Sequence, residues 1–276
     1  MEYRKKIEAK HYDRLAKEWS IRHLGQEENT DVEKLNHRVF LSYQFCEKWI
    51  KENVKKGHSV LDYGCGNGMH SILPARLGAK VTGIDISKES LNLARKLAAR
   101  ERVEITFLRM DCEALTFPDN SFDYIFDGGT FSSLNIKKAI PELARVLKPD
   151  GALLAIETLG HNPLMNLKRY INKLLGRRTG WAVKHIFKIT DLDMMKSYFG
   201  SVEAHYFNLI SLIAFPFLSL TGGVIFLRAL EKIDLLLLKI PFLQKYAFKI
   251  VIVASHPKKL MKLLTSTTSV LRRQNC

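Results

Sequence analysis

The feature of this sequence that most restricts its fold is a series of short apolar segments, several of which end in an acidic residue. Residues 59–62, 80–85, 103–109 and 122–127 form the series, and segments of helical periodicity separate its members. Strands that alternate with helices of about ten residues predict a parallel sheet with helices on both faces. The sequence therefore predicts an α/β fold with a doubly wound sheet.

The same alternation continues toward the carboxyl end. A helix is expected over residues 136–147, and Pro149-Asp150-Gly151 indicates a helix stop and turn. Further strands are expected at 152–157, 202–207 and 246–254. We expect an N-terminal helical cap over residues 1–56 and a sheet domain over 57–276, with insertions at 161–190 and 208–245.

A glycine-rich loop follows the first expected strand, with the sequence Gly64-Cys65-Gly66-Asn67-Gly68. Glycines let a backbone approach a ligand closely. A nicotinamide-binding loop would carry its third glycine one residue later. Asp85 ends the second strand, where a carboxylate can accept both hydroxyls of a ribose. Because ligands bind beyond the carboxyl ends of parallel strands, this edge is the expected binding site.

These segments resemble the class I S-adenosylmethionine (SAM)-dependent methyltransferases, specifically the UbiE/Coq5-like, methyltransferase 11-type group. The resemblance covers residues 55–160 and rests on VLDYGCGNG, VTGIDIS, FPDNSFDYIFDGGTFSSL and LARVLKPDGALLAIE. It implies a seven-stranded, Rossmann-like methyltransferase sheet, with N-terminal helices and an apolar helical insertion between strands six and seven.

The resemblance also implies SAM as the cofactor and suggests how it is held. The glycine loop packs on the methionine part, Asp85 binds the ribose and Asp111 reaches the adenine amine. The expected cofactor-binding residues are Asp62, Gly64, Cys65, Gly66, Gly68, Asp85, Ile86, Asp111, Cys112, Asp127 and Gly128. Many relatives have His-His-Leu where this chain has Ser132-Ser133-Leu134, so the family does not supply the acceptor chemistry.

The catalytic candidates lie around the fifth strand and in the N-terminal region. An oxygen acceptor needs a base that works near neutral pH. His161, just past strand five, is the best-placed candidate, followed by Glu157 and His11. Tyr12 could close over the donor, although core packing explains it equally well. The four cysteines form no CxxC pair, so we predict no metal site and a reducing, cytoplasmic environment.

Charge and apolar patterning raise the question of a membrane. The formal net charge is +15, and no acidic residue occurs from Thr158 to Thr190. Within that stretch, apolar residues at helical spacing predict a basic amphipathic helix. Residues 206–227 carry no charge, but a span there would put strands six and seven on opposite sides of a bilayer. We therefore expect peripheral association with an anionic membrane surface.

Together these observations predict methyl transfer to a small acceptor that is hydrophobic or lipid-linked. A nucleic-acid (RNA) methyltransferase is an alternative that the charge suggests. Basic and aromatic residues are not interleaved as a base-stacking surface needs, so nucleic acid is the less favoured partner. A catalytically inactive SAM-fold binding protein is a further alternative, which the intact set of acidic strand ends disfavours. The oligomeric state is left open.

Overall fold

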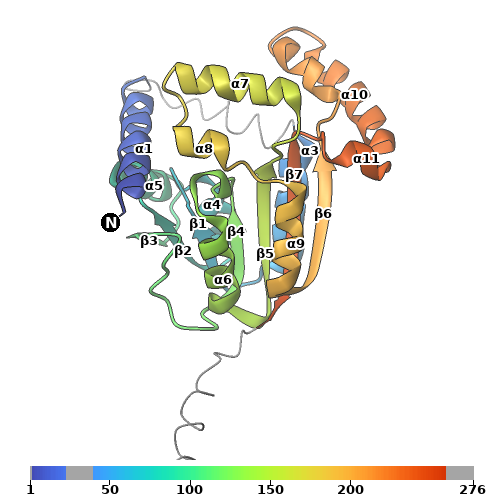
Figure 1. Cartoon of the computed structure of the whole chain (residues 1–276). Coiled ribbons are helices and arrows are strands. Elements are labelled where there is room, and N and C mark those ends of the chain that lie inside the picture. The colour runs from blue at the N-terminus through green and yellow to red at the C-terminus, as the bar shows by residue number, and fades with distance from the viewer. Residues whose placement is uncertain (1, 23–39, 259–276) are drawn as a thin grey trace, which may run out of the picture.

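The computed structural model describes residues 2–22 and 40–258 (Figure 1). In chain order the elements are α1 (Tyr3–Arg22), α3 (Leu41–Asn53), β1 (Ser59–Tyr63), α4 (Met69–Arg76), β2 (Lys80–Asp85), α5 (Lys88–Arg100), β3 (Ile105–Arg109), β4 (Phe122–Asp127), η1 (Phe131–Ser133), α6 (Ile136–Val146), β5 (Leu147–Thr158), α7 (Pro163–Leu174), α8 (Gly180–Lys184), α9 (Ile189–Tyr198), β6 (Phe199–Phe207), η2 (Ser211–Phe217), α10 (Gly223–Leu237), α11 (Pro241–Gln244) and β7 (Lys249–Pro257). Part of the expected cap, and the C-terminal residues from 259 onward, lie outside the described residues.

The seven strands form one sheet in the order β3-β2-β1-β4-β5-β7-β6. Strands β1 to β5 pair in parallel, and β7 runs antiparallel to both β5 and β6. The expected doubly wound, seven-stranded α/β sheet is thus confirmed. Because the order reverses between β1 and β4, a crevice opens at the carboxyl ends of these two strands, where such sheets bind ligands.

Helices cover both faces of the sheet. On one face, Ile50 of α3 clusters with Val81 of β2. On the other face, Leu143 of α6 and Met195 of α9 pack with Ile125 of β4. A sheet buried on both faces has strands that are apolar at nearly every position, which explains why the strand segments were readable from the sequence.

The expected turn at Pro149-Asp150-Gly151 lies instead within a strand. Helix α6 ends at Val146, and β5 begins directly afterwards at Leu147. The pairing of β5 with β4 shifts register between Phe122 and Tyr124, so these residues form an irregularity at the start of the strand. Proline and glycine are tolerated at such bulges, where ladder hydrogen bonds are interrupted.

The segment between β6 and β7 folds into η2, α10 and α11, beside the sheet (Figure 1). Its polar anchor is Asp234 of α10, which is buried. The Asp234 carboxylate accepts hydrogen bonds from the backbone N–H groups of Leu209, Ile210 and Ser211, at 2.8 to 3.2 Å. Among the described helices, none is both long and apolar enough to cross a membrane.

Helix α7 lies at the same end of the molecule as α10 and α11 (Figure 1). Its one buried residue is Arg169, which is 4% exposed and donates hydrogen bonds to the Leu159 carbonyl and the Asn166 side chain. The helix is amphipathic, as the sequence predicts, but the residue that it buries is this arginine and not a leucine. Leu164 and Leu174, which are 66% and 69% exposed, face outward.

Candidate functional site

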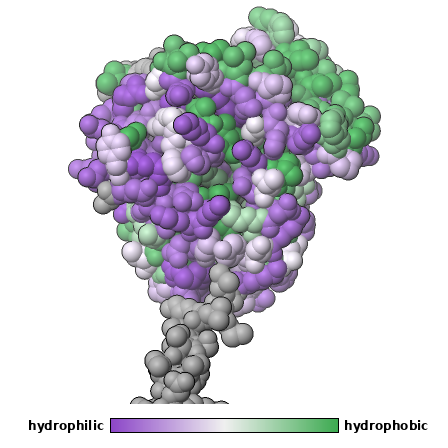
Figure 2. All heavy atoms as spheres, viewed as in Figure 1, coloured by the Kyte–Doolittle hydropathy of each residue, from purple (hydrophilic) through white to green (hydrophobic). Residues whose placement is uncertain are grey.

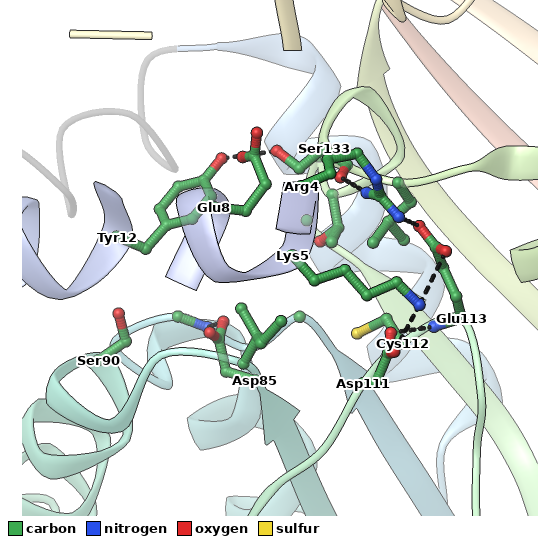
Figure 3. Close-up of a pocket in the computed structure, with 17 residues that line it drawn as sticks. Arg4, Lys5, Glu8, Tyr12, Asp85, Ser90, Asp111, Cys112, Glu113 and Ser133 are labelled. Carbon is green, nitrogen blue, oxygen red and sulfur yellow. Dashed lines mark hydrogen bonds and ion pairs between the residues drawn. The ribbon is translucent and has the colours of Figure 1, made fainter. Parts of the chain in front are cut away.

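A cavity of about 180 Å³ lies between α1 and the carboxyl ends of β1, β2 and β4 (Figure 3). Helix α1 covers it from one side with residues spaced about one turn apart. The loops that follow the strands form the opposite wall. The lining residues are Arg4, Lys5, Glu8, Tyr12, Gly64, Gly66, Asp85, Ile86, Ser90, Asp111, Cys112, Glu113, Gly128, Gly129, Thr130, Ser133 and Leu134.

The glycine loop forms the part of the wall that follows β1. Gly64 and Gly66 have φ angles of +66° and +52°, a region that side-chain-bearing residues seldom occupy. A Cβ atom at Gly64 would collide with the side chain of Thr130, whereas one at Gly66 would meet no atom within 4 Å. The loop thus packs tightly against the β4 loop and leaves its backbone open toward the cavity.

Asp85 holds this loop in place from the end of β2. Its carboxylate accepts hydrogen bonds from the backbone N–H groups of Gly66, at 2.9 Å, and Ser87, at 2.8 Å. Burial raises the pKa of Asp85, although these hydrogen bonds oppose the rise. Each carboxylate oxygen keeps a free lone pair, and the side chain lines the cavity, so it can accept hydroxyl protons from a bound ribose.

The third strand contributes an acidic pair that α1 neutralises. Lys5 donates to Asp111 at 2.6 Å and lies 3.0 Å from a carboxylate oxygen of Glu113. Arg4 contacts Glu113 at 2.5 Å, and Asn135 donates its N–H to the same carboxylate. These ion pairs fix α1 over the cavity and explain why its volume is below the range of about 300–1,000 Å³ that is usual for ligand sites.

Four of the expected cofactor residues shape the site without lining the cavity. Asp62 is buried and accepts a hydrogen bond from Ser71 at 2.5 Å, and burial raises its pKa to about 7. Cys65 is buried against α5, and Gly68 has a positive φ at the start of α4. Asp127 accepts the backbone N–H groups of the loop that follows β4. The other seven expected residues line the cavity: Gly64, Gly66, Asp85, Ile86, Asp111, Cys112 and Gly128.

None of the three expected catalytic residues lines the cavity. His161 lies between β5 and α7, and its Nε2 accepts the backbone N–H of Ile189, the first residue of α9, at 3.4 Å. Burial lowers the pKa of His161, and the charges of Lys188 and Lys245 lower it further. The role of His161 as a base stays a prediction, and its position outside the cavity lining does not favour that role.

The other two candidates have structural contacts. Glu157 is buried and accepts the backbone N–H of Phe131 at 2.7 Å, and burial raises its pKa. It also lies against Asp127, whose pKa is raised by burial and by the Glu157 charge. The side chain of His11 lies 3.4 Å from that of Arg14 on α1.

Sequence reasoning missed the contribution of α1 apart from Tyr12. Arg4, Glu8 and Tyr12 are four residues apart and share one helix face, which is the pattern that could have indicated them. The Tyr12 hydroxyl lies 2.7 Å from that of Ser133.

Comparisons with known proteins agree with this geometry. Residues 60–151 match the family described as a methyltransferase domain. Over 112 residues the chain is 36% identical to the ribosomal protein L11 methyltransferase of Burkholderia mallei (strain NCTC 10229), a match covering 40% of this chain and 35% of that protein. The chain thus spans about a third of the length of the curated relatives it matches.

Solved structures share the fold. Haemonchus contortus phosphoethanolamine N-methyltransferase 2, in complex with SAM, has a TM-score of 0.54 and 21% identity, over 78% of this chain and 53% of that one. The PH0226 protein of Pyrococcus horikoshii OT3 has a TM-score of 0.55 and 18% identity, over 84% and 93% of the two chains.

The sheet order, the glycine loop and the acidic strand ends are those of the class I SAM-dependent methyltransferase fold, whose cofactor is SAM. Within this class, the part of the chain that belongs to the methyltransferase domain family is residues 60–151. The UbiE/Coq5-like subgroup stays a prediction.

Proposed function

We propose that the chain transfers the methyl group of SAM to a small hydrophobic or lipid-linked acceptor at a membrane surface. The donor half rests on the cavity, where Asp85 and Asp111 would hold the ribose and the adenine amine. Bound SAM supplies an activated methyl group on a positively charged sulfur. The acidic cavity complements that charge, and the closing helix α1 excludes water, so the protein contributes mainly positioning.

The observation that carries the acceptor half is the orientation of α7. A surface helix of a water-exposed protein buries its apolar stripe. Here Arg169 is buried and the leucines point outward. Exposure of large aliphatic side chains to water costs free energy, and a nonpolar partner on this face would remove that cost.

The insertion between β6 and β7 extends the same surface. Figure 2 shows apolar residues gathered at the upper end of the molecule, over the regions of α7 and α10. We call this surface the apolar face, and its large exposed side chains are Leu164, Leu167, Tyr170, Ile171, Leu174, Leu175, Ile213, Phe217, Leu220, Val224, Ile225, Phe226, Ile233, Leu235, Leu236, Ile240 and Phe242.

Charge on these elements favours an anionic bilayer over a protein partner of mixed charge. Residues 158–190 contain no acid, and the two acids of the insertion, Glu231 and Asp234, are buried. Exposed Lys168, Lys173 and Lys239 flank the apolar residues. Shallow apolar insertion combined with cationic attraction is the arrangement that anchors proteins at an interface. The free, buried cysteines Cys46, Cys65 and Cys112 fit a cytoplasmic side.

Flotation with vesicles tests this proposal. We expect the chain to float with vesicles of phosphatidylcholine mixed with phosphatidylglycerol, and less with phosphatidylcholine alone. Replacing both Leu167 and Leu174 with glutamine should lower the partition coefficient by at least about tenfold, since each inserted leucine contributes about 1.5–3 kcal/mol when fully buried. Leu108→Gln is the matched control, because Leu108 is exposed on β3, at the edge of the sheet.

Methyl transfer is measured with SAM labelled in its methyl group, with a lipid extract in the vesicles as the acceptor source. Label in the organic phase supports the proposal. Label that enters added RNA or protein instead, together with no flotation, would contradict it and favour the alternative acceptors.

A further inference from the structure

Glu8 is a buried carboxylate with no hydrogen-bond partner, and it lines the cavity. It lies on α1, is 4% exposed, and neither of its oxygens makes a hydrogen bond within the described part of the chain. In Figure 3 its carboxyl group lies on the α1 side of the cavity, near Tyr12 and Ser133, while Asp85 and Asp111 lie on the opposite side.

The two arginines whose charges act on Glu8, Arg4 and Arg178, are engaged elsewhere. Arg4 bonds to Glu113 and to the Ser133 carbonyl, and Arg178 donates to the Ser132 hydroxyl. The Tyr12 hydroxyl lies against that of Ser133. Burial therefore raises the pKa of Glu8, although nearby Thr179, Arg4 and Arg178 each pull it down.

An unpaired buried carboxylate destabilises the folded chain, because it loses its hydration and gains no hydrogen bond in return. Such groups persist in native structures where a ligand or a reaction uses them. The acids of the donor site differ in this respect, because Asp85, Asp111 and Glu113 all accept hydrogen bonds within the protein. Glu8 differs from them because it accepts no hydrogen bond within the described part of the chain. A bound methyl acceptor could therefore donate a hydrogen bond to it.

We propose that Glu8 binds the methyl acceptor, accepting a hydrogen bond from the O–H or N–H group whose heavy atom is methylated, and takes that proton during transfer. The inference rests on the proposed methyl transfer and names its substrate class: an acceptor with a proton-bearing oxygen or nitrogen nucleophile. A tertiary amine, which has no proton to give when neutral, does not fit.

The step balances in bonds and charge. A lone pair of the acceptor atom forms the new bond to the methyl carbon, and the carbon–sulfur bond breaks with its electrons remaining on sulfur. The acceptor proton moves to Glu8, which releases it to water after the products leave. A carboxylate whose proton affinity is raised by burial suits this task near neutral pH.

Thermal unfolding of the full chain tests whether the buried Glu8 carboxylate lowers the stability of the folded state. The folded pKa of Glu8 lies above its unfolded value, so its burial penalty is absent at low pH and grows as pH rises through that range. Glu8→Gln should therefore raise the melting temperature by about 2–4 °C at pH 8, and this gain should vanish toward pH 4. Glu18→Gln, which removes a carboxylate of the same helix that pairs with Arg14, should show no such gain.

Binding and turnover supply the second readout. Glu8→Gln should bind SAM within about twofold of the unaltered chain in calorimetry. Transfer of label to the lipid extract should fall about 10²–10⁴-fold, with loss of the acidic limb of the pH–rate profile.

Several results would overturn the inference. One is a lower melting temperature at pH 8, which would mark Glu8 as a structural residue, and another is an unaltered transfer rate. If the unaltered chain binds SAM but labels no lipid, the proposed acceptor fails by itself. The melting temperatures and the pH profile with any other labelled acceptor still decide the role of Glu8.

Discussion

Lys5 provides the sharpest test of how α1 controls the donor site. Its ammonium group lies 2.6 Å from Oδ2 of Asp111, while the other oxygen of Asp111 accepts the Glu113 N–H. Burial lowers the pKa of Lys5, but its hydrogen bonds to Asp111 and Glu113 outweigh this and raise it overall. Each oxygen of the carboxylate expected to bind adenine thus already accepts one hydrogen bond, and for Oδ2 the donor is the ammonium group of the covering helix.

The expected effect of Lys5→Met follows from this competition. The exposed fractions of the two side chains are 11% for Lys5 and 28% for Asp111, so solvent screens the pair in part. We therefore take about 1 kcal/mol for the interaction, which corresponds to about fivefold in affinity. Lys5→Met frees Asp111 for the adenine amine and should bind SAM about fivefold more tightly.

Calorimetry at low and high salt gives the measurement and its control. Salt weakens partly exposed ion pairs, so the advantage of Lys5→Met should shrink as ionic strength rises. Lys6→Met removes an exposed charge from the same helix and should leave SAM affinity unchanged. Equal binding by Lys5→Met would refute the competition between Lys5 and the adenine amine. Weaker binding would refute it as well and would show that Lys5 itself contacts the ligand.

Three further substitutions test other parts of the structure. Asp85→Asn should weaken SAM binding about 10–100-fold in calorimetry, because hydrogen bonds to a charged group contribute about 1.5–3 kcal/mol; unchanged affinity would contradict the donor site. Asp234→Ala leaves three backbone N–H groups without their acceptor, so unfolding in urea should show a loss of about 3 kcal/mol, whereas Asp193→Ala, at an exposed position, should show almost none. The pKa of Asp62 rises from 3.8 to about 7 on folding, so its penalty appears as pH rises through that window. Asp62→Asn should raise the melting temperature at pH 8 and lose this advantage near pH 4.

Local patterns predicted the sheet domain because each pattern depends on neighbouring residues. Strands 80–85 and 122–127 have the expected bounds. Between them, Ser87 caps the start of α5, where its hydroxyl accepts the N–H of Ser90 at 3.0 Å. The donor residues at the strand ends followed from the strands, because parallel topology brings the carboxyl ends to one edge.

The contribution of α1 could not be predicted in the same way. Lys5 meets Asp111 across 106 positions of sequence, and no local pattern relates the two. Charged residues four apart on a helix usually indicate a solvated face. In α1 this expectation is wrong, because Lys5 pairs with Asp111 and Glu113. That pairing depends on the position of α1 over the ends of the strands, which the sequence does not indicate.

The direction in which α7 and the insertion face is the other point that the sequence leaves open. Amphipathic spacing defines two helix faces without indicating which one is buried. In α7 the buried residue is Arg169, which donates to the Leu159 carbonyl. Helix α10 buries Leu227 together with Asp234, and the Asp234 carboxylate closes the turn into η2. Two separate elements at one end of the molecule thus anchor themselves through buried polar groups and present aliphatic side chains outward. One such helix could be explained by its own local hydrogen bonds, but two helices that share an end of the molecule, neither of which carries an exposed acid, support the proposed nonpolar, anionic surface outside the protein.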